Sequence, residues 1–157
     1  LNHRLERRAR PAGRPIAGGW ITSRYGQRQD PFNGSREFHR GIDFATQAGA
    51  PIFAVASGVV TSAEYRSDYG YLLEIRHADG YSTRDAHCQS LAVAAGEAVR
   101  QGEIIAKVGS SGRATGPHLH FEVHKDGRHT DPARFLGRRR APPPDPDVFA
   151  DGAADVS

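Results

Sequence analysis

Short apolar segments, each followed within a few residues by a turn signal, fill the middle of the chain. The clearest turn signals are Asp79-Gly80 and Asp126-Gly127, because aspartate and glycine tolerate the positive φ angles of a tight hairpin. No long stretch repeats its apolar residues with the helical period of about 3.6. The sequence therefore predicts a mainly β, antiparallel fold, with strands over residues 41–45, 51–63, 71–77, 81–87, 104–108 and 119–124.

The chain is long enough for one domain with a real core, since it has 157 residues, 38% of them hydrophobic. We expect this domain to span residues 20–136. Residues 1–19 are rich in arginine and are expected to form a flexible basic arm or the end of a linker; residues 137–157 are expected to form a disordered tail rich in arginine, proline and aspartate. Methionine is absent even at position 1, so we expect a processed product or a segment of a longer precursor, with any membrane anchor upstream.

Charge and cysteine content narrow the classes of function. The formal net charge is +3 and the basic residues concentrate near the two ends, so no stripe of Lys and Arg interleaved with aromatics indicates nucleic-acid binding. No run approaches the roughly 20 apolar residues of a membrane helix, so we expect no membrane contact from this segment. The single cysteine, Cys88, excludes an internal disulfide and a multi-cysteine zinc site.

Residues 118–124 alternate strictly between polar and apolar side chains. In a strand, residues two apart face the same side of the sheet. The apolar members are therefore expected in the core, and the other face carries the polar members His118, His120, Glu122 and His124. This pattern alone leaves two interpretations open, metal binding by these histidines and solvated surface histidines.

A second cluster, residues 39–44, shows the same alternation. An extended backbone places His39 and Asp43 on one face with Gly41 between them, which leaves room for an ion. Two imidazoles and one carboxylate are a known catalytic zinc set, with the fourth tetrahedral position left for water. The alternative is that Asp43 caps a turn or pairs with Arg40. The His-Glu-X-X-His helix of thermolysin-like proteases is absent.

Further segments accompany these two clusters along the chain. They are Ser23-Arg24-Tyr25-Gly26, Ala54 to Val60 with Gly58, Tyr69-Gly70, His77 with Gly80-Tyr81, Ala86-His87, Gly96, Gly102, Gly109-Ser110-Ser111-Gly112, Thr115-Gly116-Pro117 and Asp131-Pro132. In this order, and over residues 19–136, the set resembles the lysostaphin-like (LytM-type) zinc metalloendopeptidases of bacterial cell walls.

The resemblance implies a strongly curved antiparallel sheet, similar to a barrel-sandwich, with a substrate groove. It implies that His39, Asp43 and His120 hold one Zn²⁺ per chain, whereas His87 and His118 are catalytic and flank the water that the metal activates. It further implies an endopeptidase of the cell envelope, periplasmic or extracellular, that hydrolyses cross-links or stem peptides of peptidoglycan. We expect a monomer, and the D-alanyl bond as its target.

Two residues beside His87 depart from the family's pattern. Asp85 stands where tyrosine is usual, and Cys88 where leucine or asparagine is common. In one regular strand Asp85 shares a face with His87, so it would orient His87, raise its pKa or bring another carboxylate near the zinc. Cys88 falls on the opposite face, as a small core residue. The alternative function is therefore a catalytically impaired LytM-type domain that binds and activates a cell-wall amidase.

Other features receive no catalytic role. His77 is expected to be structural or solvated, and residues 109–116 are expected to form one wall of the groove or, alternatively, a plain hairpin connection. A carrier domain, suggested by Lys107 within a Val-X-X-Gly rhythm, is disfavoured because the usual Asp-Lys or Met-Lys hairpin tip is missing. No role is assigned to His3, His124, His129 or Glu122.

Overall fold

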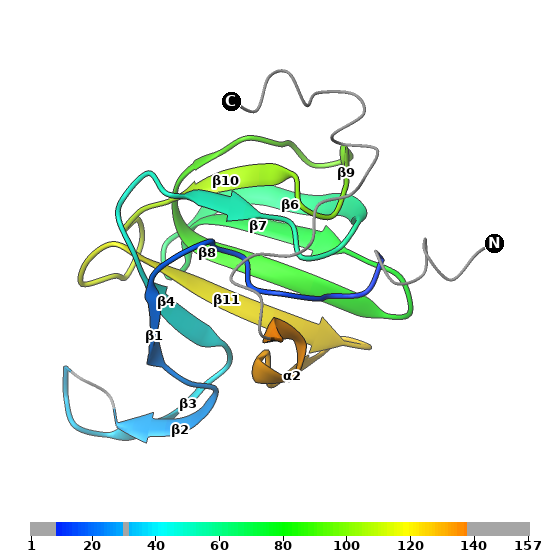
Figure 1. Cartoon of the computed structure of the whole chain (residues 1–157). Helices are drawn as coiled ribbons and strands as arrows, with labels where there is room; N and C mark the ends of the chain where they lie inside the picture. Colours follow the sequence, from blue (N-terminus) through cyan, green and yellow to red (C-terminus); the bar gives the residue numbers. More distant parts are fainter. Residues whose placement is uncertain (1–8, 30–31, 138–157) are drawn as a thin grey trace.

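The computed structural model describes residues 9–29 and 32–137 (Figure 1). Antiparallel strands make up most of this part, as the sequence predicts, and the short helix α2 (Ala133–Leu136) follows them. The strands are β1 (Trp20–Ser23), β2 (Gly26–Gln29), β3 (Arg36–His39), β4 (Ile42–Ala45), β5 (Pro51–Phe53), β6 (Gly58–Arg66), β7 (Gly70–Arg76), β8 (Tyr81–Leu91), β9 (Ala98–Val99), β10 (Ile104–Val108), β11 (His118–Lys125) and β12 (Arg128–Thr130).

One sheet of ten strands forms the body of the protein, in the order β1-β4-β11-β8-β7-β6-β9. β10 pairs with both β5 and β8, and β12 pairs with β11. The sheet does not close into a barrel, since its path begins at β1 and ends at β9. β2 and β3 form a separate two-stranded ribbon below β1 and β4 in Figure 1. The candidate site residues of the sequence analysis therefore lie on β4, β11 and β8, which are consecutive neighbours in this order, and on β3.

Both expected tight hairpins are present. Asp79 and Gly80 connect β7 to β8 with φ angles of 60° and 78°, and Asp126 and Gly127 connect β11 to β12 with 51° and 80°. Two successive positive φ angles are typical of the hairpin turns that match strand twist. The sequence signal therefore predicted these two turns correctly.

The expected strand over residues 51–63 is instead two strands. β5 pairs with β10, whereas β6 pairs with β7 and β9, so the chain has to change direction between them. Residues 54–57 make this change, and the Ala54 amide donates to the Glu103 carbonyl at 2.9 Å. This run is apolar without a strong turn signal, so its pattern alone reads as a single long strand.

The alternation in β11 and β4 fills the core as expected. Leu119, Phe121 and Val123 of β11 are at most 1% exposed, as are Ile42 and Phe44 of β4. These side chains pack in one hydrophobic cluster with residues from β5, β7 and β10. The polar residues that alternate with them are thereby directed to the opposite face.

Residues 9–19 correct the expectation of a flexible arm. Ile16 is 1% exposed and belongs to the hydrophobic core. The backbone of this segment is also paired, since the Ala12 amide donates to Val55 at 3.0 Å and the Phe53 amide donates to Pro15 at 2.7 Å. This part therefore packs as part of the domain. Residues 1–8 and all but the first residue of the expected tail lie outside the described residues.

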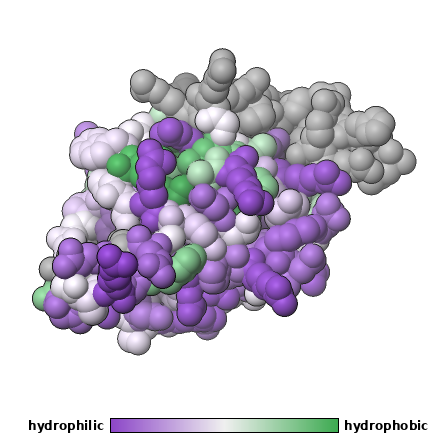
Figure 2. Space-filling model, turned by 90° about the horizontal axis from the view of Figure 1, so that it is seen from below, coloured by the Kyte–Doolittle hydropathy of each residue, from purple (hydrophilic) through white to green (hydrophobic). Residues whose placement is uncertain are grey.

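One face of the molecule is mainly polar. Figure 2 shows one face covered largely by hydrophilic residues, with hydrophobic residues confined to small areas. Within the described ranges, the structure contains no helix with the length and apolarity that a membrane crossing requires.

Candidate metal centre

The pairing of β4 with β11 brings the first candidate ligands together. Asp43 of β4 lies directly opposite His120 of β11 in the antiparallel register, so their side chains share one face of the sheet. Gly41 permits this close approach, because a Cβ atom at that position would lie 2.3 Å from the Phe121 carbonyl oxygen and 3.0 Å from His120 Cε1. His39, at the end of β3, completes the group from the other side.

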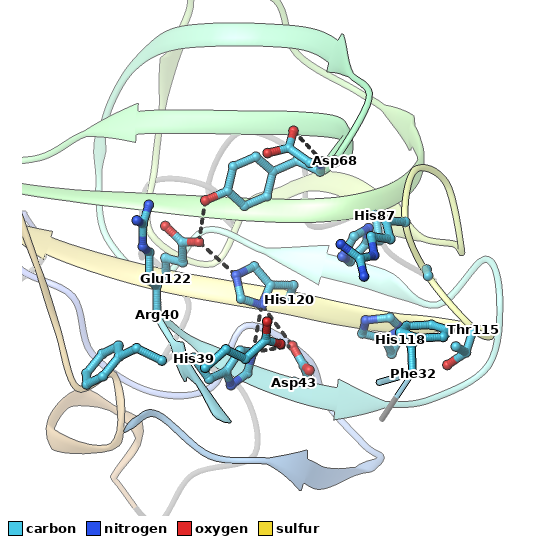
Figure 3. Close-up of a pocket in the computed structure, with 15 residues that line it drawn as sticks. Phe32, His39, Arg40, Asp43, Asp68, His87, Thr115, His118, His120 and Glu122 are labelled. Atoms are coloured by element: carbon cyan, nitrogen blue, oxygen red, sulfur yellow. Dashed lines mark hydrogen bonds and ion pairs between the residues drawn. The ribbon is translucent and has the colours of Figure 1, made fainter. Parts of the chain in front are cut away.

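Three atoms of these residues converge on one point (Figure 3). His120 Nδ1 lies 2.8 Å from Asp43 Oδ1, and His39 Nε2 lies 3.2 Å from Asp43 Oδ1 and 3.3 Å from His120 Nδ1. Ligand atoms around a tetrahedral zinc ion lie roughly 3.4 Å apart, given bonds of about 2.0–2.2 Å. The separations are close to this value or slightly shorter, so the donor set fits zinc in both size and chemistry.

The outer hydrogen bonds of the two imidazoles fix which nitrogen faces the centre. His39 Nδ1 lies 3.0 Å from the Arg24 carbonyl, and His120 Nε2 lies 2.7 Å from Glu122 Oε2. A carbonyl and an ionised carboxylate can only accept, so both of these nitrogens carry hydrogen. The opposite nitrogens then bring lone pairs to within 3.3 Å of each other and of the Asp43 carboxylate. Such a convergence of acceptors requires a cation or a proton between them.

The pKa values of Asp43 and His120 are shifted by the contacts within this cluster. Burial raises the pKa of Asp43, but hydrogen bonds and charge interactions with His120 and His39 outweigh it and hold that pKa far below its ordinary range. Burial lowers the pKa of His120, yet its hydrogen bonds to Asp43 and Glu122 outweigh this effect and raise the pKa to about 9. The centre thus stabilises positive charge, whether it is a proton on His120 or a metal ion.

His87 reaches the same pocket through a β-bulge. Tyr71 pairs with Cys88, whereas Leu73 pairs with Asp85, so β8 contains one residue more than β7 at this place. His87 has a φ of 60°, which is uncommon for a residue other than glycine. Its amide donates to Tyr69 at 2.7 Å and its Nδ1 donates to the Ser111 carbonyl at 2.8 Å, so both backbone and ring are held.

His118 lies beside His87. Their ring centroids are 4.8 Å apart, and the His87 and His120 centroids are 6.0 Å apart. His118 Nδ1 donates to the Gly116 carbonyl at 2.8 Å, so in both rings the lone pair belongs to Nε2. Burial lowers the pKa of His87 to about 4, so this imidazole is neutral near pH 7. Figure 3 shows both side chains on the side of the pocket away from Glu122.

The expectation that Asp85 shares a face with His87 is wrong. Asp85 pairs with Leu73 on one side and Phe121 on the other, and both are core residues, so its side chain faces the core. The bulge breaks the alternation between residues 85 and 87. Asp85 is 2% exposed, and burial raises the pKa of its carboxyl to about 8. Cys88 is buried in the core as expected, and burial raises the pKa of its thiol.

The loop of residues 109–116 lines the pocket through Arg113, Ala114 and Thr115. It lies very close to the start of β7, because a Cβ atom on Gly112 would be 2.3 Å from the Gly70 amide nitrogen. Ser111 fastens the loop, since its Oγ donates to the Cys88 carbonyl at 2.6 Å and accepts from the Tyr71 amide at 3.0 Å. The same pocket is lined by Phe32 and Phe38 of the segment before β4.

Glu122 is a member of this pocket that the sequence reasoning left without a role. Its side chain is 1% exposed and its carboxylate accepts from His120, from His124 Nε2 at 2.8 Å and from the Tyr69 hydroxyl at 2.8 Å. Burial raises the pKa of Glu122, but the hydrogen bonds from His120 and His124 outweigh it and lower that pKa strongly. The sequence signal for this role was its position two residues after His120, which places both side chains on the same face of the strand.

His77 and His129 do not belong to the converging set of three. His77 is buried, with Nδ1 2.8 Å from the Ser57 carbonyl and Nε2 2.9 Å from Thr83 Oγ1. This arrangement is that of a structural residue. His129 lies next to Tyr25, whose hydroxyl is 2.7 Å from its Nδ1. His3 lies outside the described residues.

Among characterised proteins, two relatives illustrate the sequence similarity. The chain is 42% identical over 118 residues to the DD-carboxypeptidase/endopeptidase Mpg of Neisseria meningitidis, a match that covers 75% of this chain and 27% of that protein. It is 41% identical over 106 residues to the peptidoglycan DD-endopeptidase ShyC of Vibrio cholerae, covering 68% of this chain and 24% of that protein. The chain thus spans only about a quarter of the length of these curated relatives.

Solved structures give the same result for the fold. A zinc containing peptidase from Vibrio cholerae superposes with a TM-score of 0.72 and 37% identity, over 78% of this chain and 39% of that one. The catalytic domain of lysostaphin from Staphylococcus simulans superposes with a TM-score of 0.68 and 30% identity, over 75% of this chain and 92% of that one. The model of peptidase family M23 matches residues 37–132, a segment that contains the three converging residues and both neighbouring histidines. Because this match covers more than half of the chain, the chain belongs to peptidase family M23.

Proposed function

We propose that this domain is a zinc-dependent endopeptidase that hydrolyses peptide bonds of peptidoglycan in the bacterial cell envelope. The observation that carries the proposal is the convergence of three acceptor atoms, from His39, Asp43 and His120, beside two further imidazoles in the same pocket. The names of the relatives support peptidoglycan as the substrate, and the name of one structural neighbour supports zinc.

His39 Nε2, Asp43 Oδ1 and His120 Nδ1 would hold the metal. Zinc, when bound there, supplies Lewis-acid activation of a water molecule and of the scissile carbonyl. His87 and His118 present Nε2 lone pairs to the same pocket, because their Nδ1 hydrogens are donated to backbone carbonyls. These two Nε2 atoms accept the proton of the attacking water and return a proton to the leaving amine.

The lining of the pocket combines aromatic and charged side chains. Phe32 and Phe38 contribute the aromatic part. Arg40 and Arg113 contribute positive charge, and Glu37 and Asp68 contribute negative charge. Stem peptides of peptidoglycan combine small apolar side chains with carboxylates, so both kinds of lining have a counterpart. The D-alanyl cross-link is the bond that we propose, in line with the relatives named as DD-endopeptidases.

The alternative of an impaired domain that activates an amidase rested on Asp85. Its carboxyl faces the core between Leu73 and Phe121 and therefore does not approach His87 or the metal centre from within the pocket. The observation that favoured the alternative thus no longer supports it.

The decisive experiment measures bound zinc and fragment release together. The purified protein is expected to contain one zinc per chain and to release fragments from isolated peptidoglycan, whose masses identify the bond. His120→Ala is expected to lose both properties, whereas His129→Ala, a matched substitution outside the pocket, keeps them. Stoichiometric zinc without cleavage would favour an activator role, and failure of the wild-type protein to bind zinc would overturn the proposal.

A further inference from the structure

The carboxylate of Glu122 accepts hydrogen bonds from three side chains around the pocket. It lies two residues after His120 on β11 and is 1% exposed. His120 Nε2 and the Tyr69 hydroxyl both donate to Oε2, at 2.7 Å and 2.8 Å, and His124 Nε2 donates to Oε1 at 2.8 Å. Figure 3 shows Glu122 and His120 pointing toward each other from the same strand.

The hydrogen bond between His120 and Glu122 determines which nitrogen of His120 faces Asp43 and His39. A carboxylate has no hydrogen to donate, so the hydrogen of the His120–Glu122 bond belongs to Nε2 of the imidazole. The lone pair of His120 is therefore on Nδ1, the atom that lies 2.8 Å from Asp43 Oδ1 and 3.3 Å from His39 Nε2. Rotation of the ring by a half turn would break the bond to Glu122 and remove a ligand from the centre.

The other two donors keep Glu122 in place. Burial of an ionised carboxylate is costly unless hydrogen bonds satisfy its oxygens. His124 donates to Oε1 and Tyr69 donates to Oε2. Tyr69 also links this group to the second half of the site, because its backbone carbonyl accepts the His87 amide at 2.7 Å.

We propose that Glu122 is a positioning residue of the metal site, which holds His120 in the orientation and tautomer that direct Nδ1 to the metal. The inference rests on the proposed zinc function and adds a residue to it. Glu122 acts through its hydrogen bond to His120. Carboxylates that hold metal-bound histidines in this way typically raise metal affinity by about 10–100-fold.

A matched pair of variants separates this role from simple burial of a carboxylate. Glu122→Gln and Asp85→Asn each replace a buried carboxylate, 1% and 2% exposed, by its amide in neighbouring strands of one sheet. Only Glu122 bonds to a proposed ligand. Zn²⁺ dissociation constants, measured by competition with a chromogenic chelator, are expected to rise by about 10–100-fold for Glu122→Gln and to stay unchanged for Asp85→Asn.

The outcomes distinguish the two proposals. If the wild-type protein binds zinc and folded Glu122→Gln binds it equally well, the positioning role is refuted and the metal site stands. If the wild-type protein binds no zinc, both proposals fall. An equal loss of affinity in Asp85→Asn would also contradict the inference, because it would assign the effect to general perturbation of the sheet.

A second measurement needs no variant and so does not depend on a folded mutant. In the zinc-loaded wild-type protein, long-range ¹H–¹⁵N correlation spectra report which nitrogen of each histidine carries hydrogen. His120 is expected to carry it on Nε2, with Nδ1 shifted by the metal. Hydrogen on Nδ1 of His120 would overturn the proposal.

Discussion

The rings of His87 and His118 lie with their centroids 4.8 Å apart although the two residues reach the pocket by different routes. His118 begins β11 and follows the regular alternation of that strand. His87 depends on a β-bulge and a φ of 60° in β8. Each ring donates its Nδ1 hydrogen to a backbone carbonyl of the same loop, Ser111 or Gly116. The loop of residues 109–116 therefore sets the tautomer of both imidazoles at once.

We expect His87→Ala and His118→Ala to separate catalysis from metal binding. Neither residue belongs to the converging set of three, so zinc content is expected to remain that of the wild type. Loss of a proton-transfer group typically lowers the rate by about 10²–10⁴-fold, and fragment release from peptidoglycan should fall by that order. Loss of zinc from either variant would indicate that the substituted histidine contributes to metal binding and not only to proton transfer.

Ser111→Ala tests the fastening of this loop. The Ser111 hydroxyl bonds to the Cys88 carbonyl and the Tyr71 amide, whereas its carbonyl holds the His87 ring. Removing the hydroxyl leaves both backbone groups without that partner, at a cost of about 1–3 kcal/mol in the free energy of unfolding. We expect a lower kcat with unchanged zinc content, measured beside Ser110→Ala, whose neighbouring side chain is exposed. Equal effects of the two substitutions would refute a specific role for Ser111.

The convergence of His39, Asp43 and His120 could be predicted from the sequence because strands carry these residues. Strict alternation placed His120 on the face of β11 that points away from the core, and the same alternation placed Asp43 on the corresponding face of β4. The parity argument failed at Asp85, since it assumes a regular strand and β8 contains an extra residue before Cys88. A positive φ is uncommon at any residue other than glycine, so His87 alone did not predict the bulge.

The boundaries of the domain were harder to predict for a different reason. Residues 9–19 have the arginine, proline and glycine content of a linker, but Ile16 fills a place in the core. A single large apolar side chain among alanine, glycine, proline and arginine is a weak signal, so the composition favoured a linker. The role of Glu122 was not predicted, because a carboxylate on a strand can bond to any of several neighbours. Only the hydrogen bond to His120 in the structure identifies its partner.

Gly41→Ala tests whether close approach of β4 and β11 is needed for the metal centre. The added Cβ atom would lie 2.3 Å from the Phe121 carbonyl oxygen, so the two strands would have to separate where Asp43 faces His120. We expect weaker zinc binding and a free energy of unfolding lower by about 1–3 kcal/mol. Gly18→Ala is the matched control, because a Cβ atom there meets nothing within 4 Å. Wild-type zinc affinity in Gly41→Ala would contradict this account.

Asp85 predicts an unusual dependence of stability on pH. Burial raises the pKa of its carboxyl from the ordinary 3.8 to about 8, so the folded protein binds a proton that the unfolded chain has released over this range. The contribution of Asp85 is therefore most favourable below pH 3.8 and is lost as the pH rises toward 8, by at most about 1.4 kcal/mol per pH unit.

Asp85→Asn isolates this effect, because the amide does not titrate while the other groups of the protein still do. Among the described residues, Asp85 Oδ1 has no hydrogen-bond partner, so the variant loses no bond from that atom. We expect the stability of Asp85→Asn relative to the wild type, measured by chemical denaturation, to be greater at pH 8 than at pH 5. If the difference in stability between the two proteins is the same at pH 5 and pH 8, the Asp85 carboxyl does not titrate between these pH values. Its environment would then be less apolar than its position between Leu73 and Phe121 implies.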